Sequence, residues 1–237
     1  MFTLSVCGIP LEIHGASERC RQLCAAFIVP DKPDAQRIVI TDADIGEEVR
    51  RWPQPAGDRA SGEFTLLCRK VQKALLPRDC LLIHSVALDI AGEGYLLLGK
   101  SGIGKTTLGR HCQRMLPGAR IINGDKPMVL IDGGRILAYG TPWCGKENLC
   151  VNDHVAVRHL VFLRQAAANS RRPLNRKESF YRLIHQIPYP ETEPEVKAYA
   201  ALVEAVLTHC VASEYGCVNA PCAAVDLVKA WPEANPA

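Results

Sequence analysis

Residues 99–107 read GKSGIGKTT, and this stretch decides the fold. It matches the phosphate-loop pattern G-x-x-x-x-G-K-[ST] from Gly99 to Thr106. The apolar run YLLL at 95–98 predicts a buried strand before it, and the helical spacing of apolar residues after it predicts a helix. Such a turn aims backbone N–H groups and the positive end of a helix dipole at one point. The sequence therefore predicts a phosphate-binding loop.

Each position of this loop has an expected role. Lys105 reaches the β/γ-phosphate oxygens, the Thr106 hydroxyl ligates Mg²⁺, and the glycines let the backbone approach the phosphates. A glycine-rich turn that carries a lysine by chance is the competing interpretation, which the flanking strand and helix disfavour. The expected nucleotide-binding residues of the loop are Gly99, Ser101, Gly102, Ile103, Gly104, Lys105, Thr106 and Thr107.

The composition is that of an ordinary globular protein, with 237 residues, 48% apolar and 22% charged. This length suits one large domain, or a core domain with an appendage. A formal net charge of +3 is too small to indicate a nucleic-acid partner or an anionic membrane. The first residues lack the pattern of a signal peptide, and no apolar run is long enough for a membrane span. We therefore expect a cytoplasmic protein without nucleic-acid or membrane partners.

Eleven cysteines are present, without a C-x-x-C pair. Most lie among aliphatic residues, where a thiol behaves as a small buried hydrophobe. We expect free thiols in a reducing compartment. A zinc site assembled from scattered cysteines and histidines is the alternative.

The chain is expected to divide near residue 80. Before it, alternating apolar residues predict a strand pair, and helical spacing predicts two helices. The expected elements there are strands at 2–6, 9–13 and 37–41, helices at 17–27 and 64–75, and a loop at 43–60. After it we expect one long strand at 81–90 that turns into the loop strand, a strand at 120–122, a hairpin at 128–139, a strand at 159–163, and helices at 180–187 and 194–209.

Asp125 is the first candidate partner of the loop. It follows a strand that we expect beside the loop strand, about twenty residues after Lys105. A carboxylate there can hold Mg²⁺ or accept a proton from an attacking hydroxyl. A turn aspartate in Asn-Gly-Asp is the competing interpretation. Lys126 beside it either neutralises phosphate charge or is a solvated turn lysine.

His84 is the second candidate. The predicted strand places it within an apolar run, one strand before the loop, where it can face the γ-phosphate; a core histidine is the alternative. The segment at 140–147 is the third, because loops at strand ends often carry ligand-binding groups. In it Lys146 can contact phosphate and Glu147 can bind metal. A structural turn with Trp143 as a packing residue is equally compatible.

These residues together resemble one family. Residues 84–90 followed by 94–108 resemble the histidine-led strand, hairpin and phosphate loop of HPr kinase/phosphorylase. The GKTTL ending at 104–108 is similar to phosphoenolpyruvate carboxykinase. The segments DKP at 125–127 and GTPW at 140–143 resemble those of HPr-kinase-like bacterial proteins. The resemblance covers roughly residues 80–190.

The resemblance implies an α/β fold with an HPr-kinase/carboxykinase-like nucleotide-binding domain at 80–237 and a smaller N-terminal α/β region at 1–79. It implies an ATP- and Mg²⁺-dependent kinase that phosphorylates a hydroxyl, on a serine or threonine of a protein or peptide or on a small molecule. A homo-oligomer is also expected. The resemblance matches His84 to the family's active-site histidine and Asp125 to its aspartate near the metal and the attacking hydroxyl. Together with the loop pattern and the segment at 140–147, the expected catalytic residues are Asp125, His84 and Lys105. The expected metal ligands are Thr106, Asp125 and Glu147, and Lys146 joins the nucleotide-binding residues.

One departure from the family keeps two alternatives open. The kinases and carboxykinases carry two adjacent acids where this chain has Asp125 and Lys126. A non-catalytic ATP-binding sensor or scaffold in a peptide-modifying or regulatory assembly is therefore the second hypothesis. A simple ATPase or GTPase switch is the third, weakened because the sequence lacks the guanine signature N-K-x-D.

Overall fold

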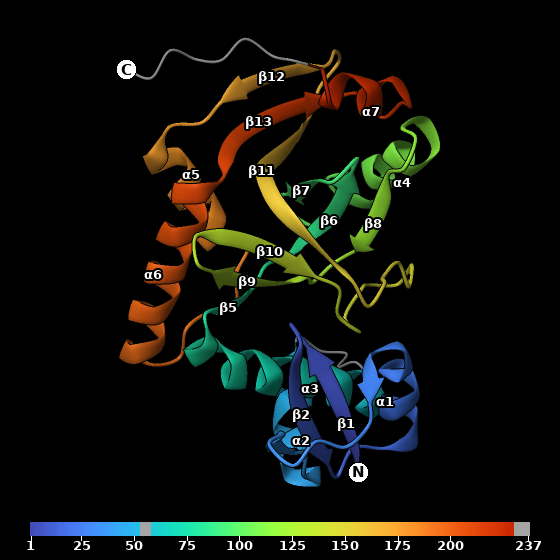
Figure 1. Cartoon of the computed structure of the whole chain (residues 1–237), viewed down its shortest axis with the longest axis vertical. Coiled ribbons are helices and arrows are strands. Elements are labelled where there is room, and N and C mark those ends of the chain that lie inside the picture. The colour runs from blue at the N-terminus through green and yellow to red at the C-terminus, as the bar shows by residue number, and fades with distance from the viewer. Residues whose placement is uncertain (53–57, 230–237) are drawn as a thin grey trace. The chain divides into compact units, whose positions relative to one another are not determined.

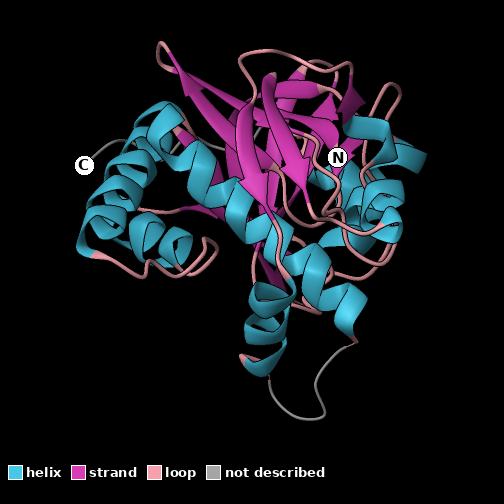
Figure 2. Ribbon diagram, turned by 90° about the horizontal axis from the view of Figure 1, so that it is seen from below, coloured by secondary structure: helices cyan, strands magenta, loops and turns pink. Residues whose placement is uncertain are grey.

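The computed structural model describes residues 1–52 and 58–229. The chain is a mixed α/β protein, as the sequence predicts, and helices and strands occur throughout it (Figure 2). It divides into two compact units, Met1–Arg78 and Asp79–Ala237. No helix in the described part is both long and apolar enough to span a bilayer.

The first unit is built on a small sheet with the strand order β3-β1-β2-β4. Strands β1 and β2 pair antiparallel, and β4 joins β2 in parallel. Leu4 and Leu11 face each other in the register and are fully buried, as the alternating sequence predicts. The elements are β1 (Phe2–Val6), β2 (Ile9–His14), α1 (Glu18–Leu23), a 3₁₀ turn (Ala25–Phe27), β3 (Ile28–Val29), β4 (Gln36–Val39), α2 (Asp42–Arg50), α3 (Arg59–Leu75) and a second 3₁₀ turn (Leu76–Arg78).

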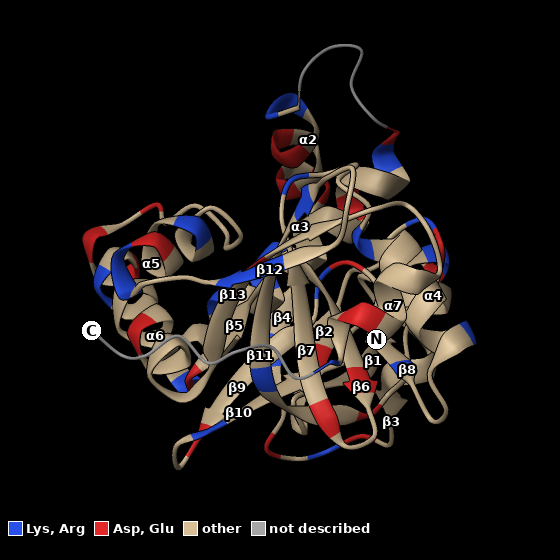
Figure 3. Ribbon diagram, turned by 90° about the horizontal axis from the view of Figure 1, so that it is seen from above, with Lys and Arg blue, Asp and Glu red and all other residues tan. Residues whose placement is uncertain are grey.

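Helix α2 contradicts the predicted loop at 43–60. The Thr41 side chain caps it by accepting a hydrogen bond from the backbone N–H of Asp44. Acidic residues in its first turn and a basic residue in its last complement the helix dipole (Figure 3). The acidic stretch is thus a helix start rather than a loop. Residues 53–57 of that prediction lie outside the described residues.

The second unit holds a larger sheet with the order β5-β9-β10-β11-β7-β6-β8, and β13 pairs with β11 and β12 (Figure 1). The long strand β11 pairs first with β10 and then lies between β7 and β13, so the sheet curls along it. The strands are β5 (Cys80–Leu82), β6 (Ser85–Ile90), β7 (Glu93–Leu98), β8 (Arg120–Asn123), β9 (Met128–Asp132), β10 (Arg135–Tyr139), β11 (His154–Gln165), β12 (Ser170–Pro173) and β13 (Val211–Cys217). The helices are α4 (Lys105–Met115), α5 (Arg176–Ile184), α6 (Glu193–His209) and α7 (Cys222–Leu227).

Helices cover this sheet in two groups (Figure 1). Helix α4 packs on β6, β7 and β8 and contacts α7, whereas α6 packs on β5, β9 and β10 and contacts α5. Leu108 and Cys112 of α4 are buried in the same core cluster as Val86 and Leu97 of the sheet. Met115, the last residue of α4, is 45% exposed. The core thus holds the first turns of α4 firmly against the strands that position the loop.

The predicted single strand at 81–90 is two strands, β5 and β6, interrupted at 83–84. The facing chain is interrupted at 124–127, between β8 and β9. The register continues across the break as far as Ala87, since Leu82 pairs with Met128 and Ala87 with Asn123; it shifts by one residue after Ala87. The two strand pairs are therefore one long ladder with an opening in its middle.

Two hydrogen bonds cross that opening. The backbone N–H of Ile83 donates to Pro127 O, and that of Ser85 donates to Asp125 O. Pro127 has no N–H to return, which prevents a regular ladder there. His84 consequently lies in the break rather than within a strand, which corrects the sequence prediction.

Strand β8 also differs in its neighbour. The sequence placed the strand before Asp125 directly beside the loop strand, but β6 lies between β8 and β7. Asp125 reaches the loop nevertheless, because the chain leaves β8 along the opening beside His84.

Candidate functional site

Three glycines shape the loop between β7 and α4. Gly99, Gly102 and Gly104 have φ angles of 138°, 77° and 109°, in the region that glycine alone occupies without strain. Gly104 is the N-cap of α4, and its carbonyl accepts the Leu108 N–H. The first turn of α4 holds no acidic residue, so its free N–H groups face no negative side chain of that turn. This geometry suits an anion.

Lys105 is the buried cation of the site. Its side chain lies inside the loop, where Nζ donates to Gly99 O at 2.7 Å and to Lys100 O at 3.4 Å. The same Nζ lies 2.9 Å from His84 Nε2. Burial lowers the pKa of Lys105, and the nearby Asp125 carboxylate opposes that effect. The loop's own backbone carbonyls thus hold the Lys105 amine in place.

His84 is half-buried and faces both Lys105 and Asp125. Its pKa is lowered, first by burial and then by the Lys105 charge, while Asp125 acts in the opposite direction. The ring is therefore neutral at neutral pH. Because an ammonium can only donate, Nε2 accepts the hydrogen bond from Lys105 and the ring proton sits on Nδ1. Asp125 Oδ1 lies 3.7 Å from the same nitrogen.

Asn123 positions the segment that carries Asp125. Its fully buried side chain accepts the backbone N–H of Asp125 at 2.9 Å and that of Lys126 at 2.8 Å. Its Nδ2 donates to the carbonyl and hydroxyl oxygens of Thr141, whose hydroxyl donates to Lys126 O. Asn123 was not among the residues predicted for the site. An asparagine two residues before Asp125 is nonetheless a signal for this kind of turn.

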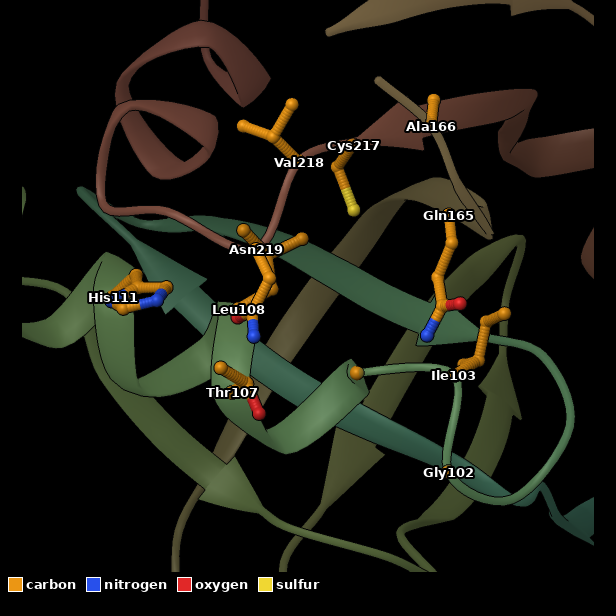
Figure 4. A pocket seen from close by; sticks show the side chains of 11 residues that line it. Gly102, Ile103, Thr107, Leu108, His111, Gln165, Ala166, Cys217, Val218 and Asn219 are labelled. Carbon is orange, nitrogen blue, oxygen red and sulfur yellow. The ribbon is translucent and has the colours of Figure 1, made fainter. Parts of the chain in front are cut away.

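Two cavities meet at the loop. The smaller, of about 220 Å³, is lined by His84, Ser101, Gly102, Gly104, Lys105, Thr106, Thr107, Gly124 and Asp125. The larger, of about 430 Å³, is lined by Gly102, Ile103, Gly104, Thr107, Leu108, His111, Gln165, Ala166, Cys217, Val218 and Asn219 (Figure 4). Gly102, Gly104 and Thr107 belong to both linings.

The linings of the two cavities differ in charge. The smaller holds Lys105, Asp125 and the His84 imidazole. No Lys, Arg, Asp or Glu lines the larger, where apolar groups such as Val218 alternate with neutral polar ones such as Gln165. Figure 4 shows that its walls come from the loop, from α4 and from the ends of β11 and β13. The pair suits a ligand with an anionic part and a neutral part.

The structure brings most of the expected site residues together. Eight of the nine residues that line the smaller cavity belong to the sequence prediction for the loop and its partners, namely Ser101, Gly102, Gly104, Lys105, Thr106, Thr107, His84 and Asp125. Ile103 lines the larger cavity, and Gly99 lines neither but accepts the Lys105 amine.

Lys146 and Glu147 line neither cavity. The Lys146 side chain is exposed, and the Glu147 carboxylate forms an ion pair with Arg110 of α4. The structure therefore does not place these two residues with Thr106 and Asp125, the other expected ligand-binding groups.

The oxygen donors of the smaller cavity fit a hard cation. The Thr106 hydroxyl and the Asp125 carboxylate line the same space, and such oxygens are the ligands that Mg²⁺ takes. The eleven cysteines are free thiols. Within residues 1–52 and 58–229, no group of three or more His, Cys, Asp or Glu side chains could hold a metal ion, so the alternative zinc site finds no ligand set there.

Comparison with known proteins adds little. No protein-family model matches the chain, and no curated protein sequence matches it. A solved structure of the Hpr(Ser) kinase/phosphatase from Coxiella burnetii is similar over 52% of this chain and 88% of that chain, at 14% sequence identity and a TM-score of 0.28. This likeness is at most that of a distant relative.

Proposed function

We propose that the protein transfers the γ-phosphoryl group of Mg·ATP to a hydroxyl acceptor. The observation that carries the proposal is the Lys105 amine, buried between a loop carbonyl and the His84–Asp125 pair in a cavity at the start of α4. A positive helix end, a fixed cation and a carboxylate are the parts that phosphoryl transfer requires.

The nucleotide occupies both cavities in this proposal. Its phosphates lie in the smaller one, against the loop amides and Lys105, and its nucleoside lies in the neutral larger one. Thr107 lines both and stands at the junction, beside the innermost phosphate. A volume of about 430 Å³ is within the range of small-molecule sites, roughly 300–1,000 Å³.

Thr106 and Asp125 are the residues that would hold Mg²⁺. When bound, the ion would neutralise negative charge on the phosphates. Asn123 fixes the direction of Asp125 through two backbone N–H groups, so the carboxylate meets the phosphates without reorganisation.

Asp125 is the proposed acceptor of the hydroxyl proton. His84 Nε2 already accepts from Lys105, so the imidazole orients the amine rather than taking the proton. Lys126, whose Nζ lies 3.9 Å from Asp125 Oδ2, offsets negative charge that develops in the transition state.

The finer assignment follows the sequence resemblance. We propose an HPr-kinase-like serine kinase of the cytoplasm, with its nucleotide-binding domain at 80–237 and an N-terminal α/β region at 1–79, that forms a homo-oligomer. Its acceptor is a serine or threonine of a protein or peptide, or a small-molecule alcohol.

A second candidate function rests on the Lys126–Asp125 pair. A cation stands where the related kinases carry another acid, so the carboxylate is partly neutralised. This favours an ATP-binding sensor or scaffold that holds the nucleotide without transferring its phosphate.

Lys105→Ala tests the proposal. Because the variant removes the cation that faces the phosphates, we expect Mg·ATP affinity and transfer to fall by roughly 100-fold or more. Lys100→Ala is the matched control, since the exposed Lys100 contributes only its backbone carbonyl to the site. Equal nucleotide affinity in the wild type and Lys105→Ala would contradict a nucleotide site.

Asp125→Asn separates the two candidates. The kinase loses transfer of labelled phosphate to the acceptor in a lysate while its ATP binding is largely retained. The sensor binds ATP and labels no acceptor, in the wild type as in the variant.

A further inference from the structure

Cys144 and Cys150 lie at the two ends of a loop that packs against the segment carrying Asp125. Cys144 and Cys150 bracket residues 145–149. At one end of the loop, the backbone of Cys150 forms an isolated antiparallel β-bridge with that of Asn123. At the other, the residue before Cys144, Trp143, accepts the backbone N–H of Lys126.

The two thiols are hydrogen-bonded to each other and differ in exposure. Cys144 is 4% exposed, whereas Cys150 is partly exposed. The hydrogen bond between them raises the pKa of Cys144 and lowers that of Cys150, with burial acting to raise both. Cys144 is thus the thiol that donates, and Cys150 is the more exposed residue of the two.

This arrangement joins an accessible sulfur to a buried partner within reach. Redox-responsive cysteines are accessible, have thiolate character and lie beside a second thiol that resolves the first oxidation product. We propose that Cys150 and Cys144 form a peroxide-responsive thiol pair that closes residues 144–150 with a disulfide. The proposal does not depend on the proposed function.

The chemistry balances in two steps. The Cys150 thiolate attacks a peroxide oxygen; the O–O bond breaks, hydroxide leaves and takes a proton from solvent to become water, and Cys150 is a sulfenic acid. The Cys144 sulfur then attacks the Cys150 sulfur; the S–O bond breaks, and the hydroxyl departs as water with the Cys144 proton. The peroxide is reduced by two electrons and the two thiols are oxidised by two.

Other cysteines lack one of the two features. Cys20 and Cys24 are hydrogen-bonded as well, but both are buried, at 2% and 0% exposure. Cys222 is exposed, and its sulfur accepts a weak hydrogen bond from Asn169 rather than from a thiol. Only a pair that combines access with a resolving thiol is expected to form a disulfide in the folded chain.

The crosslink would act directly on the Asp125 segment. A Cβ on Gly124 would lie 2.9 Å from Cys144 O and 3.2 Å from the Leu149 side chain. Both ends of the loop therefore pack closely against this glycine. A Cβ on Gly145 would lie 3.2 Å from that of Asp125. A disulfide that ties the loop ends together therefore fixes the backbone on both sides of Gly124.

Peptide mapping after peroxide treatment tests the pair. The folded full chain is treated with hydrogen peroxide at neutral pH, blocked with a maleimide in denaturant and digested with trypsin without reductant. Cleavage after Lys146 separates the two cysteines, so the disulfide appears as peptide 136–146 linked to peptide 147–158. We expect this linked peptide to form before Cys222 is oxidised, and reductant to remove it.

Two variants assign the order of events. Cys144→Ala is expected to leave a sulfenic acid on Cys150 that dimedone traps, and Cys150→Ser is expected to leave Cys144 as a thiol. Cys222→Ser, the matched control, forms the linked peptide as the wild type does. Oxidation of Cys222 without the 144–150 link, or a link that appears only in unfolded chain, would overturn the proposal.

Discussion

At the scale of single residues, one buried amide organises the candidate site. The Asn123 side chain makes two bonds to the backbone of Asp125 and Lys126 and two to Thr141. Asn123 and Thr141 are both 0% exposed, so water cannot replace a partner lost between these two residues. The direction of the Asp125 carboxylate thus depends on a residue that contacts neither cavity.

Asn123→Ala tests this dependence. Removing the amide leaves buried donors and acceptors unpaired, so we expect the free energy of unfolding to fall by about 2–4 kcal/mol in urea titrations. Asn219→Ala, at an exposed asparagine, is the control and should change it by less than about 0.5 kcal/mol. If the free energy of unfolding changed as little in Asn123→Ala as in the control, the turn at 123–126 would be stable without the Asn123 side chain.

His84 makes stability depend on pH. Its pKa is lowered in the folded chain from the ordinary value of 6.5, by burial and by Lys105, so below that value the unfolded chain binds more protons. The folded state therefore loses stability as the pH falls through about 6.5 toward the lower folded pKa. Above that window the group contributes no penalty.

We expect His84→Asn to flatten this dependence. The free energy of unfolding, measured between pH 7.5 and 5.5, should fall less in the variant than in the wild type, because the group that takes up the extra proton is gone. Identical slopes in the two proteins would exclude His84 as their source.

Residue roles were predictable where a motif carries them. The spacing of Gly99, Gly104 and Lys105 defines the loop by itself, and the structure has the expected positive φ angles at both glycines. Asn123 escaped prediction because its role depends on Thr141, a residue distant in sequence that no local pattern connects to it.

At the scale of elements, β7 and β11 approach each other unusually closely. A Cβ on Gly94 would lie 2.4 Å from Ala156 O and 2.8 Å from Val157 Cα, at the point where the register of the pair shifts. Only glycine fits there, and β7, the strand that contains it, leads into the phosphate loop.

Gly94→Ala should therefore destabilise the second unit strongly. We expect a loss on the order of 3 kcal/mol in the free energy of unfolding, since backbone atoms must move to admit the methyl group. Gly92→Ala, two residues earlier, is the control, because a Cβ there has no neighbour within 4 Å. Its only cost is the positive φ of 87°, so we expect the free energy of unfolding to fall by about 1 kcal/mol. Equal losses of unfolding free energy in the two variants would mean that the β11 backbone at Val157 moves aside at little cost.

Elements were predictable where apolar periodicity is strong. The alternation in β1 and β2 and the helical spacing in α3 gave these elements, because burial of one face dominates their pattern. Strands β12 and β13, with sequences SRRP and VASEYGC, were not predicted, since polar residues interrupt any alternation. They form because β13 pairs in parallel with β11 and β12 then pairs with β13. This pairing depends on the tertiary fold, which the local sequence does not indicate.

At the scale of the whole molecule, the candidate site assembles from distant segments of the second unit. The larger cavity joins the loop before α4 to the ends of β11 and β13, which lie about sixty and a hundred and ten residues further along the chain. No local pattern indicates this cavity. The strand order was equally beyond prediction, because β6 lies between β7 and β8 through pairing across a turn and a helix.

Filling the larger cavity should separate nucleoside from phosphate binding. In Ala166→Trp an indole takes the proposed place of the nucleoside, so we expect ATP affinity to fall more than tenfold while inorganic tripolyphosphate binds as before. Ala167→Trp is the matched control, because Ala167 is exposed and lines neither cavity. Calorimetric titration of both ligands measures the difference, and parallel losses for ATP and tripolyphosphate would place the nucleoside elsewhere.

The opening in the ladder between residues 83–84 and 124–127 also limits how this chain can change in length. Leu82 pairs with Met128 on one side and Ala87 with Asn123 on the other, so four residues separate the paired positions on each strand, 83–86 on one and 124–127 on the other. A single insertion or deletion in 124–127 would turn every later side chain of β9 to the wrong face of the sheet. Residues at the opening can be exchanged in evolution, but their number is set by the sheet around them.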